Sequence, residues 1–283
     1  MSTPSLGVPV IPGEVGSRGW VLRLTPFALL GTSRARRIVE RNFLVYRRGW
    51  IFIISGFLEP FFYLLSIGVG LNKLVGSIDV GGQVVAYAAF VAPGLLAASA
   101  MNGGMIDATF NVFFKLKIVK VYDAMLSTPL GVGDVALGEL SWALLRGALY
   151  SGAFLCVMAG LGYVVSPWAA LCFPGALCIT FAFAAVGMAG TTYMRSWQDF
   201  DMVSLAIIPL FLFSATFFPL SVFPGWLQFV VRCTPLYQGV ALLRAFDLGL
   251  FSWALLGHVA YLLAMGTAGL VVTSRRLARL LLP

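Results

Sequence analysis

The chain has 283 residues, of which 60% are hydrophobic and only 11% charged, whereas soluble domains carry about 25% charged and about 45–50% apolar residues. A soluble fold of this size has no interior for so much hydrocarbon, so the composition excludes an ordinary soluble domain and predicts an all-α integral membrane protein. The net charge is +8, and the basic residues lie at the edges of apolar runs. Their excess is therefore explained by membrane topology and membrane lipids, not by a nucleic-acid partner.

The amino-terminal region divides into two parts. Residues 1–31 are expected to form a loose cytoplasmic tail, and residues 32–49 an amphipathic helix. Apolar residues fall on one stripe of that helix at positions 35, 38, 39, 43 and 46, and arginines fall on its other faces. This pattern is typical of a helix that lies in the membrane interface, although an ordinary solvated helix stays open as an alternative.

Six apolar runs are long enough to span a ~30 Å hydrocarbon core, which takes about 20 residues at ~1.5 Å each. We expect them at 50–71, 84–106, 140–164, 168–193, 202–218 and 251–273, within a transmembrane domain of residues 50–274. Pro209 is expected to bend the fifth. Residues 275–283 then form a cytoplasmic carboxyl terminus.

Two connecting regions differ from simple loops. The stretch 107–139 is too charged to span, and within it 113–135 is the expected cytoplasmic segment, with a short helix that ends before Pro129. Residues 219–249 hold apolar pieces too short to span, broken by prolines, which is the pattern of external re-entrant or interfacial helices.

Orientation follows from lysine and arginine. Six spans place both ends on one side, and that side collects most of the basic residues, whereas the other side has only Lys73, Arg232 and Arg244. Both termini are therefore predicted to be cytoplasmic. The basic residues on that side are Arg18, Arg23, Arg34, Arg36, Arg37, Arg41, Arg47, Arg48, Lys115, Lys117, Lys120, Arg195, Arg275, Arg276 and Arg279.

Ionisable groups in the hydrocarbon are costly, about 2.5–3.5 kcal/mol at mid-helix on insertion scales, so each is a candidate for the translocation path. Glu59 lies in the first span beside Pro60 and serves either as a polar lining or hinge, or as a packing contact. Glu139 and Arg146 share one face of the third helix. They are about 10 Å apart along its axis, so each needs a partner elsewhere or water. A functional and a packing role both stay open.

Motifs for catalysis are missing. The sequence has no GxxxxGK[ST], GxSxG or HExxH motif, no CxxC pair, and a single histidine. We therefore expect no ATP binding by the P-loop route, no metal site, no cofactor on this chain and no enzyme activity of its own. Passage or binding is favoured over bond-making.

The run YDAMLSTPLGVGDVALGELSWA at 122–143 resembles the cytoplasmic segment of ABC-2 type export permeases. The resemblance is chiefly to permeases that export lipo-oligosaccharide nodulation factors and more distantly to daunorubicin-type drug export permeases. Supporting pieces are LEPFFYLLSIGVGL at 58–71, FVAPGLLAASAM at 90–101 and LFLFSATFFPLSVFP at 210–224. The likeness covers nearly the whole chain after residue 35, and its order and spacing carry more weight than any single piece.

This resemblance implies a six-span subunit, with an interfacial helix and external re-entrant helices, in a bacterial cytoplasmic (inner) membrane. It implies pairing as a homodimer or heterodimer, and binding of two copies of a separate nucleotide-binding subunit that holds ATP and Mg. The substrates of such permeases are large and amphipathic: glycolipids, lipid-linked saccharides or hydrophobic drugs.

The resemblance also implies site residues. Contacts with the ATPase subunit map to the interfacial helix and to the segment after the second span, and the external gate maps to the broken region. The ATPase-coupling residues are Arg37, Arg41, Lys117, Lys120, Tyr122, Asp123, Met125, Leu126, Thr128, Pro129 and Leu130. The external gate candidates are Phe217, Phe218, Pro219, Phe223, Pro224 and Trp226.

Two other functions compete with an ABC permease. One is a stand-alone secondary transporter or channel, which would use an ionisable group such as Glu59 near mid-membrane. The other is an integral-membrane enzyme acting on lipids, which would need clustered His, Asp or Ser near one interface. Only the permease explains the apolar cytoplasmic segment together with the broken external helices.

Overall fold

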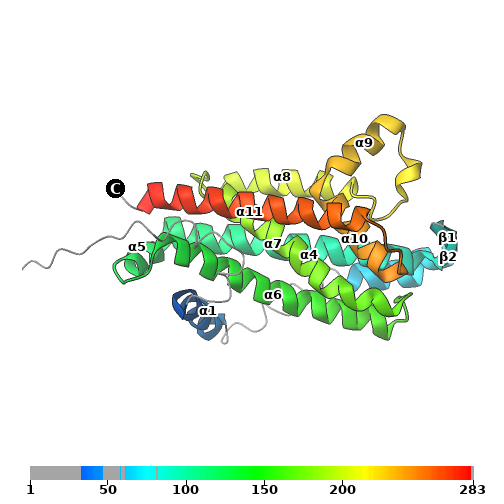
Figure 1. Cartoon of the computed structure of the whole chain (residues 1–283), viewed down its shortest axis with the longest axis horizontal. Helices are drawn as coiled ribbons and strands as arrows, with labels where there is room; N and C mark the ends of the chain where they lie inside the picture. The colour runs from blue at the N-terminus through cyan, green and yellow to red at the C-terminus, as the bar shows by residue number, and fades with distance from the viewer. Residues whose placement is uncertain (1–32, 47–57, 59–60, 81, 282–283) are drawn as a thin grey trace, which may run out of the picture.

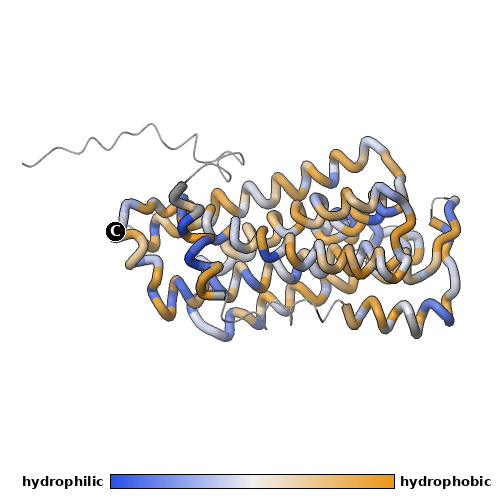
Figure 2. The backbone as a smooth tube through the Cα atoms, turned by 90° about the horizontal axis from the view of Figure 1, so that it is seen from below, coloured by the Kyte–Doolittle hydropathy of each residue, from blue (hydrophilic) through white to orange (hydrophobic). Residues whose placement is uncertain are grey.

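The computed structural model describes residues 33–46, 58, 61–80 and 82–281, and these are mainly helical. Long helices run side by side along one axis (Figure 1). Helices α1 and α5 lie at the end that carries the carboxyl terminus, and the β1–β2 hairpin lies at the opposite end. Figure 2 shows hydrophilic stretches concentrated toward these two ends, with mostly apolar helix between them.

Helix α1 (Ser33–Tyr46) packs across the start of α6. Ala35 and Ile38 are buried, whereas Phe43 is exposed. Only part of the predicted apolar stripe therefore packs against the rest of the protein. The approach to α6 is close because Gly138 has no side chain: a Cβ there would lie 2.8 Å from that of Ile38. The predicted helix is thus present, and one side of it is held by the bundle.

The region before the second predicted span is more ordered than a loop. Residues 61–66 are helical and continue through the π-helical turn η5 (Ile67–Leu71) into α3 (Asn72–Val75). Strands β1 (Ser77–Val80) and β2 (Gln83–Ala86) then form an antiparallel hairpin. The first part of the predicted first span, including Glu59 and Pro60 but not residue 58, lies outside the described residues.

Helix α4 (Tyr87–Phe113) and its continuation η6 (Phe114–Ile118) form one long rod, followed by the short α5 (Val121–Leu126) and then α6 (Val132–Gly160). The stretch 107–139, predicted to be too charged to span, contributes its two ends to the long helices, and its middle holds α5 and non-helical connections. Charged side chains at these two ends are paired between the α4–η6 rod and α6, as described below. The short helix predicted before Pro129 is confirmed.

Helix α7 (Cys172–Thr191), preceded by the 3-10 turn η7 (Pro167–Leu171), packs against α4, α6 and α11. Two glycines allow this approach: a Cβ at Gly104 would lie 2.8 Å from the carbonyl oxygen of Thr180, and one at Gly147 would lie 2.6 Å from the Thr180 methyl group. Small residues at helix contacts are the usual means of tight packing in a membrane, where lipid tails remove the hydrophobic drive for helices to associate.

The last part of the chain contains α8 (Asp199–Leu212), η8 (Leu220–Val222), α9 (Gly225–Cys233), α10 (Pro235–Leu248) and α11 (Ala254–Leu281). The fifth span was expected to reach Phe218, but α8 ends at Leu212. Pro209 lies inside the helix and lacks a donor. The Ser214 hydroxyl then donates to the Phe211 carbonyl at 2.8 Å, and Ala215 has a φ of 56°.

Four helical stretches within the described residues are long and apolar enough to cross a membrane: Tyr87–Ile118, Val132–Gly160, Pro167–Thr191 and Ala254–Leu281. At ~1.5 Å per residue, the 14 residues of α8 are about 21 Å long, short of a ~30 Å core. The short helices predicted within 219–249 are present as η8, α9 and α10.

Candidate functional site

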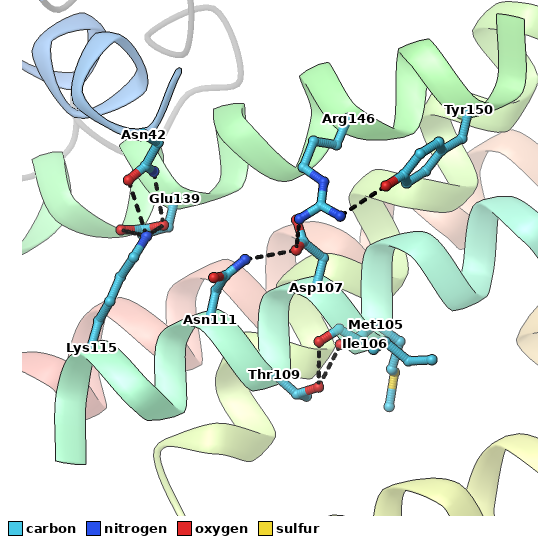
Figure 3. Close-up of polar contacts among 10 residues, drawn as sticks. All are labelled: Asn42, Met105, Ile106, Asp107, Thr109, Asn111, Lys115, Glu139, Arg146 and Tyr150. Carbon is cyan, nitrogen blue, oxygen red and sulfur yellow. Dashed lines mark hydrogen bonds and ion pairs between the residues drawn. The ribbon is translucent and has the colours of Figure 1, made fainter. Parts of the chain in front are cut away.

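Two ion pairs connect the α4–η6 rod with α6 (Figure 3). Lys115 Nζ lies 2.7 Å from Glu139 Oε2, and Arg146 pairs with Asp107. Arg146 also donates to the Tyr150 hydroxyl at 2.8 Å. The sequence predicted that Glu139 and Arg146 would each need a partner elsewhere or water. Glu139 pairs with Lys115 of η6, and Arg146 pairs with Asp107 of α4. Pairing is what allows four charged groups to lie inside an apolar bundle.

A third helix joins the first ion pair. Asn42 of α1 donates through Nδ2 to Glu139 at 3.2 Å and accepts through Oδ1 from Lys115 at 3.1 Å. The amide therefore completes a three-way contact among α1, α6 and the start of η6 (Figure 3). Asn42 is only 1% exposed, and a buried amide in this position has no water to replace a lost partner. We call Asn42, Lys115 and Glu139 the three-helix junction.

Helix α5 is anchored to the same junction. Tyr122 is 1% exposed and belongs to the apolar cluster that includes Ile38, Met125 and Leu140. Burial raises the pKa of Tyr122 well above its usual value of 10.0, and the neighbouring carboxylate of Glu139 raises it further, whereas Arg41 lowers it. Tyr122 and Met125 are the buried side chains of α5, and they fix it to an apolar cluster that it shares with α1 and α6.

The other face of α5 is open. Asp123, Thr128 and Pro129 are exposed, as are Lys117 and Lys120 in the connection before it. Lys120 has a φ of 51°, which lets the chain reverse from η6 into α5. Of the remaining predicted coupling residues, Arg37 is exposed, Tyr122 and Met125 are buried, and Arg41, Leu126 and Leu130 are half-buried. The arrangement is a rigidly anchored helix with a polar outer surface.

A separate hollow of about 410 Å³ lies between α4, α8 and the helix at 61–66. Its walls are mostly apolar and aromatic, and the Asn102 side-chain oxygen is buried without a hydrogen-bond partner among the described residues. A surface of this kind suits an amphipathic molecule. The lining residues are Tyr63, Leu95, Ala98, Ser99, Asn102, Gly103, Ile207, Ile208, Phe211 and Leu212.

The predicted external residues lie where α8 breaks and α9 begins. Phe217 packs on Phe211 with ring centroids 5.2 Å apart, and its carbonyl accepts from the Tyr87 hydroxyl at 3.2 Å. Phe218 and Trp226 are exposed. Pro219 precedes η8, Pro224 precedes α9, and Phe223 packs on Phe213 with centroids 6.4 Å apart.

A family model for the ABC-2 type transporter matches residues 34–248, which include the junction, the hollow and the external helices. The chain belongs to the ABC-2 type transporter family. This ABC-2 permease is 32% identical to Nodulation protein J of Rhizobium meliloti (strain 1021) over 74% of its own length and 79% of that protein. It is 34% identical, with the same coverage, to Nodulation protein J of Rhizobium leguminosarum bv. trifolii. No solved structure matches.

The resemblance predicted from the sequence is therefore confirmed, and the permease is a multi-pass membrane component of a transporter. Sequence reasoning missed Asn42, Lys115 and Asp107 as members of the polar contacts, and Asn102 in the hollow. Asp107 gave a signal as a charged group within an otherwise apolar helix, which names no partner, whereas Asn42 lies in a helix rich in charged residues and gave none.

Proposed function

We propose that this ABC-2 permease is the membrane subunit of an exporter whose ATP is hydrolysed by two copies of a separate subunit bound at the α5 end. The observation that carries the proposal is the anchoring of α5: its outer face is exposed, and its inner face buries Tyr122 and Met125 in an apolar cluster shared with α1 and α6. Two permease subunits, identical or different, enclose one path, and the chain itself hydrolyses nothing.

The mechanism begins with closure of the ATPase subunits against residues 122–130. Force on α5 reaches α1, α4 and α6 together, because the junction joins these helices by hydrogen bonds and an ion pair that do not yield separately. The three helices then move as a body relative to α8, which lies on the far side of the hollow. Contact, not bound nucleotide, delivers the energy.

The substrate class is a large amphipathic molecule such as a glycolipid or lipid-linked saccharide, with a hydrophobic drug as the alternative. The hollow supports this class because its apolar walls suit an acyl chain or aromatic body, and the Ser99 and Asn102 side chains supply polar contacts. The family relatives named Nodulation protein J favour the saccharide-bearing class. Both termini are cytoplasmic, in a bacterial inner membrane, as the basic residues at the α5 end suggest.

The test is substrate-stimulated ATP hydrolysis by the complex in lipid nanodiscs. A lipid-linked oligosaccharide is expected to raise the hydrolysis rate, and the free oligosaccharide is not. Asn102→Leu is expected to reduce that stimulation and leave basal hydrolysis intact, whereas Leu74→Ala, at an exposed site near the hairpin, changes neither. Equal stimulation by the free sugar, or none by any amphipathic compound, would sink the proposed substrate class.

A further inference from the structure

The main chain between α8 and η8 is buried although it is not helical. Ser214, Ala215 and Thr216 are at most 2% exposed, and Ala215 takes a left-handed φ of 56°. Backbone of this kind is stable inside a membrane protein only where other groups satisfy its donors and acceptors. We call residues 213–217 the break segment. The groups that hold it come from two other helices.

Arg244 of α10 is the main holder. Its Nη2 donates to the carbonyl oxygens of Ala215 at 3.0 Å and Thr216 at 3.2 Å. Its Nε donates to the carbonyl of Phe90 at 3.3 Å, and Cζ lies 3.9 Å from the Phe90 ring centroid. One planar guanidinium therefore bridges α10, α4 and the break segment, which a lysine ammonium cannot reproduce because it lacks the fork and the flat stacking face.

Helix α4 supplies two further contacts. The Tyr87 hydroxyl donates to the carbonyl of Phe217 at 3.2 Å. At Gly94 a Cβ would lie 3.0 Å from the Thr216 methyl group and 3.2 Å from its Cα, so the break segment lies directly on the bare backbone of α4. The segment is thus held on α4 from Thr216 to Phe217, immediately before the exposed Phe218.

When the hydrogen bonds between Arg244 and the break segment are released, no buried carboxylate is left without its partner. In the described part of the chain, the hydrogen bonds of Arg244 all go to main-chain carbonyls, and neither ion pair between side chains includes it. Water or a polar substrate group can satisfy a carbonyl once the segment lifts. Lys115 and Glu139 differ, because separating them would leave two unpaired charges.

We propose that Arg244 is a positioning residue that holds the break segment closed on α4, and that the segment lifts from Arg244 when the transporter opens outward. This inference rests on the proposed export function for the role of the opening, but the holding contact itself needs no nucleotide. Phe217 is the last residue of the segment, and Phe218 moves with it because no helix intervenes before η8.

The experiment measures how fast a membrane-impermeant maleimide labels a cysteine in the break segment. Ser214→Cys is introduced into a variant in which Cys156, Cys178 and Cys233 are replaced by serine. The buried Cys172 is kept, and its labelling reports global unfolding. The chain is purified with its genomic neighbours and reconstituted in nanodiscs, without nucleotide and after trapping with ATP and vanadate. Labelling at each cysteine is read by mass spectrometry.

Without nucleotide, Arg244→Met is expected to raise labelling of Ser214→Cys by on the order of ten-fold, because several hydrogen bonds that oppose local opening are lost. Arg232→Met, an exposed arginine on α9, is the matched control and is expected to leave the rate unchanged. In the parent protein, which carries Ser214→Cys and keeps Arg244, the labelling rate is expected to rise after trapping with ATP and vanadate. In Arg244→Met the rate is expected to be high both with and without nucleotide. A purely structural anchor would not give that nucleotide dependence.

If Arg244→Met also exposes Cys172 and therefore unfolds the protein, the milder variants Arg244→Lys and Tyr87→Phe test the holding role. Each is expected to raise the labelling rate of Ser214→Cys by about three-fold. Rates equal to the parent in both would overturn the holding role. An unchanged rate in the trapped parent, with an ATPase present, would overturn the lifting. If no ATPase co-purifies, the proposed function fails on its own, and the nucleotide-free rates still test Arg244.

Discussion

Asn42 of α1 and Glu139 of α6 are 97 positions apart in the chain and share a buried hydrogen bond of 3.2 Å. The same amide accepts from Lys115, which is itself paired with Glu139. A helix at the edge of the bundle is thereby tied to the charge pair that joins two of its long helices. Five predictions follow from this junction and from the helix anchored beside it.

Asn42→Ala is expected to lower substrate-stimulated hydrolysis several-fold and to cost only about 1 kcal/mol of stability, because the Lys115–Glu139 pair survives. Asn42→Asp is expected to be worse in both respects, since it places a second carboxylate against Glu139. Phe43→Ala, at the neighbouring exposed position, is the control. Equal effects of the two Asn42 substitutions would contradict the electrostatic account of the junction.

Removal of one member of the ion pair is expected to destabilise the permease more than removal of both. Lys115→Met or Glu139→Gln alone leaves a polar group without its partner and is expected to cost about 3–5 kcal/mol, as for buried pairs in general. The double variant is expected to recover part of that loss. Unfolding by denaturant in detergent micelles measures all three. A double variant as unstable as the sum of the single ones would argue against a direct pair.

Tyr122 is expected to contribute mainly by packing. Tyr122→Ala removes a buried aromatic ring and is expected to cost about 3–5 kcal/mol, whereas Tyr122→Phe removes a hydroxyl that has no hydrogen-bond partner among the described residues and is expected to cost far less. Thermal unfolding in detergent compares them with Tyr193→Phe, at an exposed site. If Tyr122→Phe were as damaging as Tyr122→Ala, the hydroxyl and not the ring would carry the anchoring.

The raised pKa of Tyr122 also predicts a pH dependence. A phenol whose pKa is raised by folding keeps its proton in the native state, so its contribution to stability is complete below the pKa of the unfolded chain. The contribution is lost as pH rises above ~10. Tyr122→Phe should therefore flatten the fall in stability above about pH 10. An identical alkaline decline in both proteins would contradict the prediction.

The exposed face of α5 is expected to carry the ATPase contact. Asp123→Lys reverses the charge on that face and is expected to abolish association with the ATPase subunit without changing the stability of the isolated permease, since Asp123 is exposed. Asp79→Lys, an exposed carboxylate in the hairpin at the opposite end, is the matched control. Loss of association in the control, or retention in Asp123→Lys, would place the contact elsewhere.

The membrane class, the long helices and the short α5 could be predicted because each depends on local composition: apolar length for spans and Pro129 for the helix end. The extents of α4 and α6 could not, since their charged residues are tolerated only through pairs across the two helices. Lys115 and Glu139 are 24 positions apart, and the local sequence around each residue does not indicate the other as its partner.

The end of α8 shows the same limit. Pro209 predicted a bend, but the helix stops at Leu212, and Arg244, far along the chain, satisfies carbonyls of the non-helical segment that follows. Tyr122 was predicted at the coupling site from family resemblance alone, and its burial follows from α1 and α6 packing over it. Tertiary partners, and not local pattern, decide which residues of a short helix face outward.

The most direct measurement is co-purification. The tagged permease is expressed with its genomic neighbours, extracted in mild detergent and assayed for ATP hydrolysis in parallel with Asp123→Lys. The account predicts a stable complex with an ATPase subunit that hydrolyses ATP, and loss of that subunit in the variant while the permease itself remains folded. A permease that purifies alone and stable, with no hydrolysis in any eluate, would contradict the account and favour a self-contained transporter.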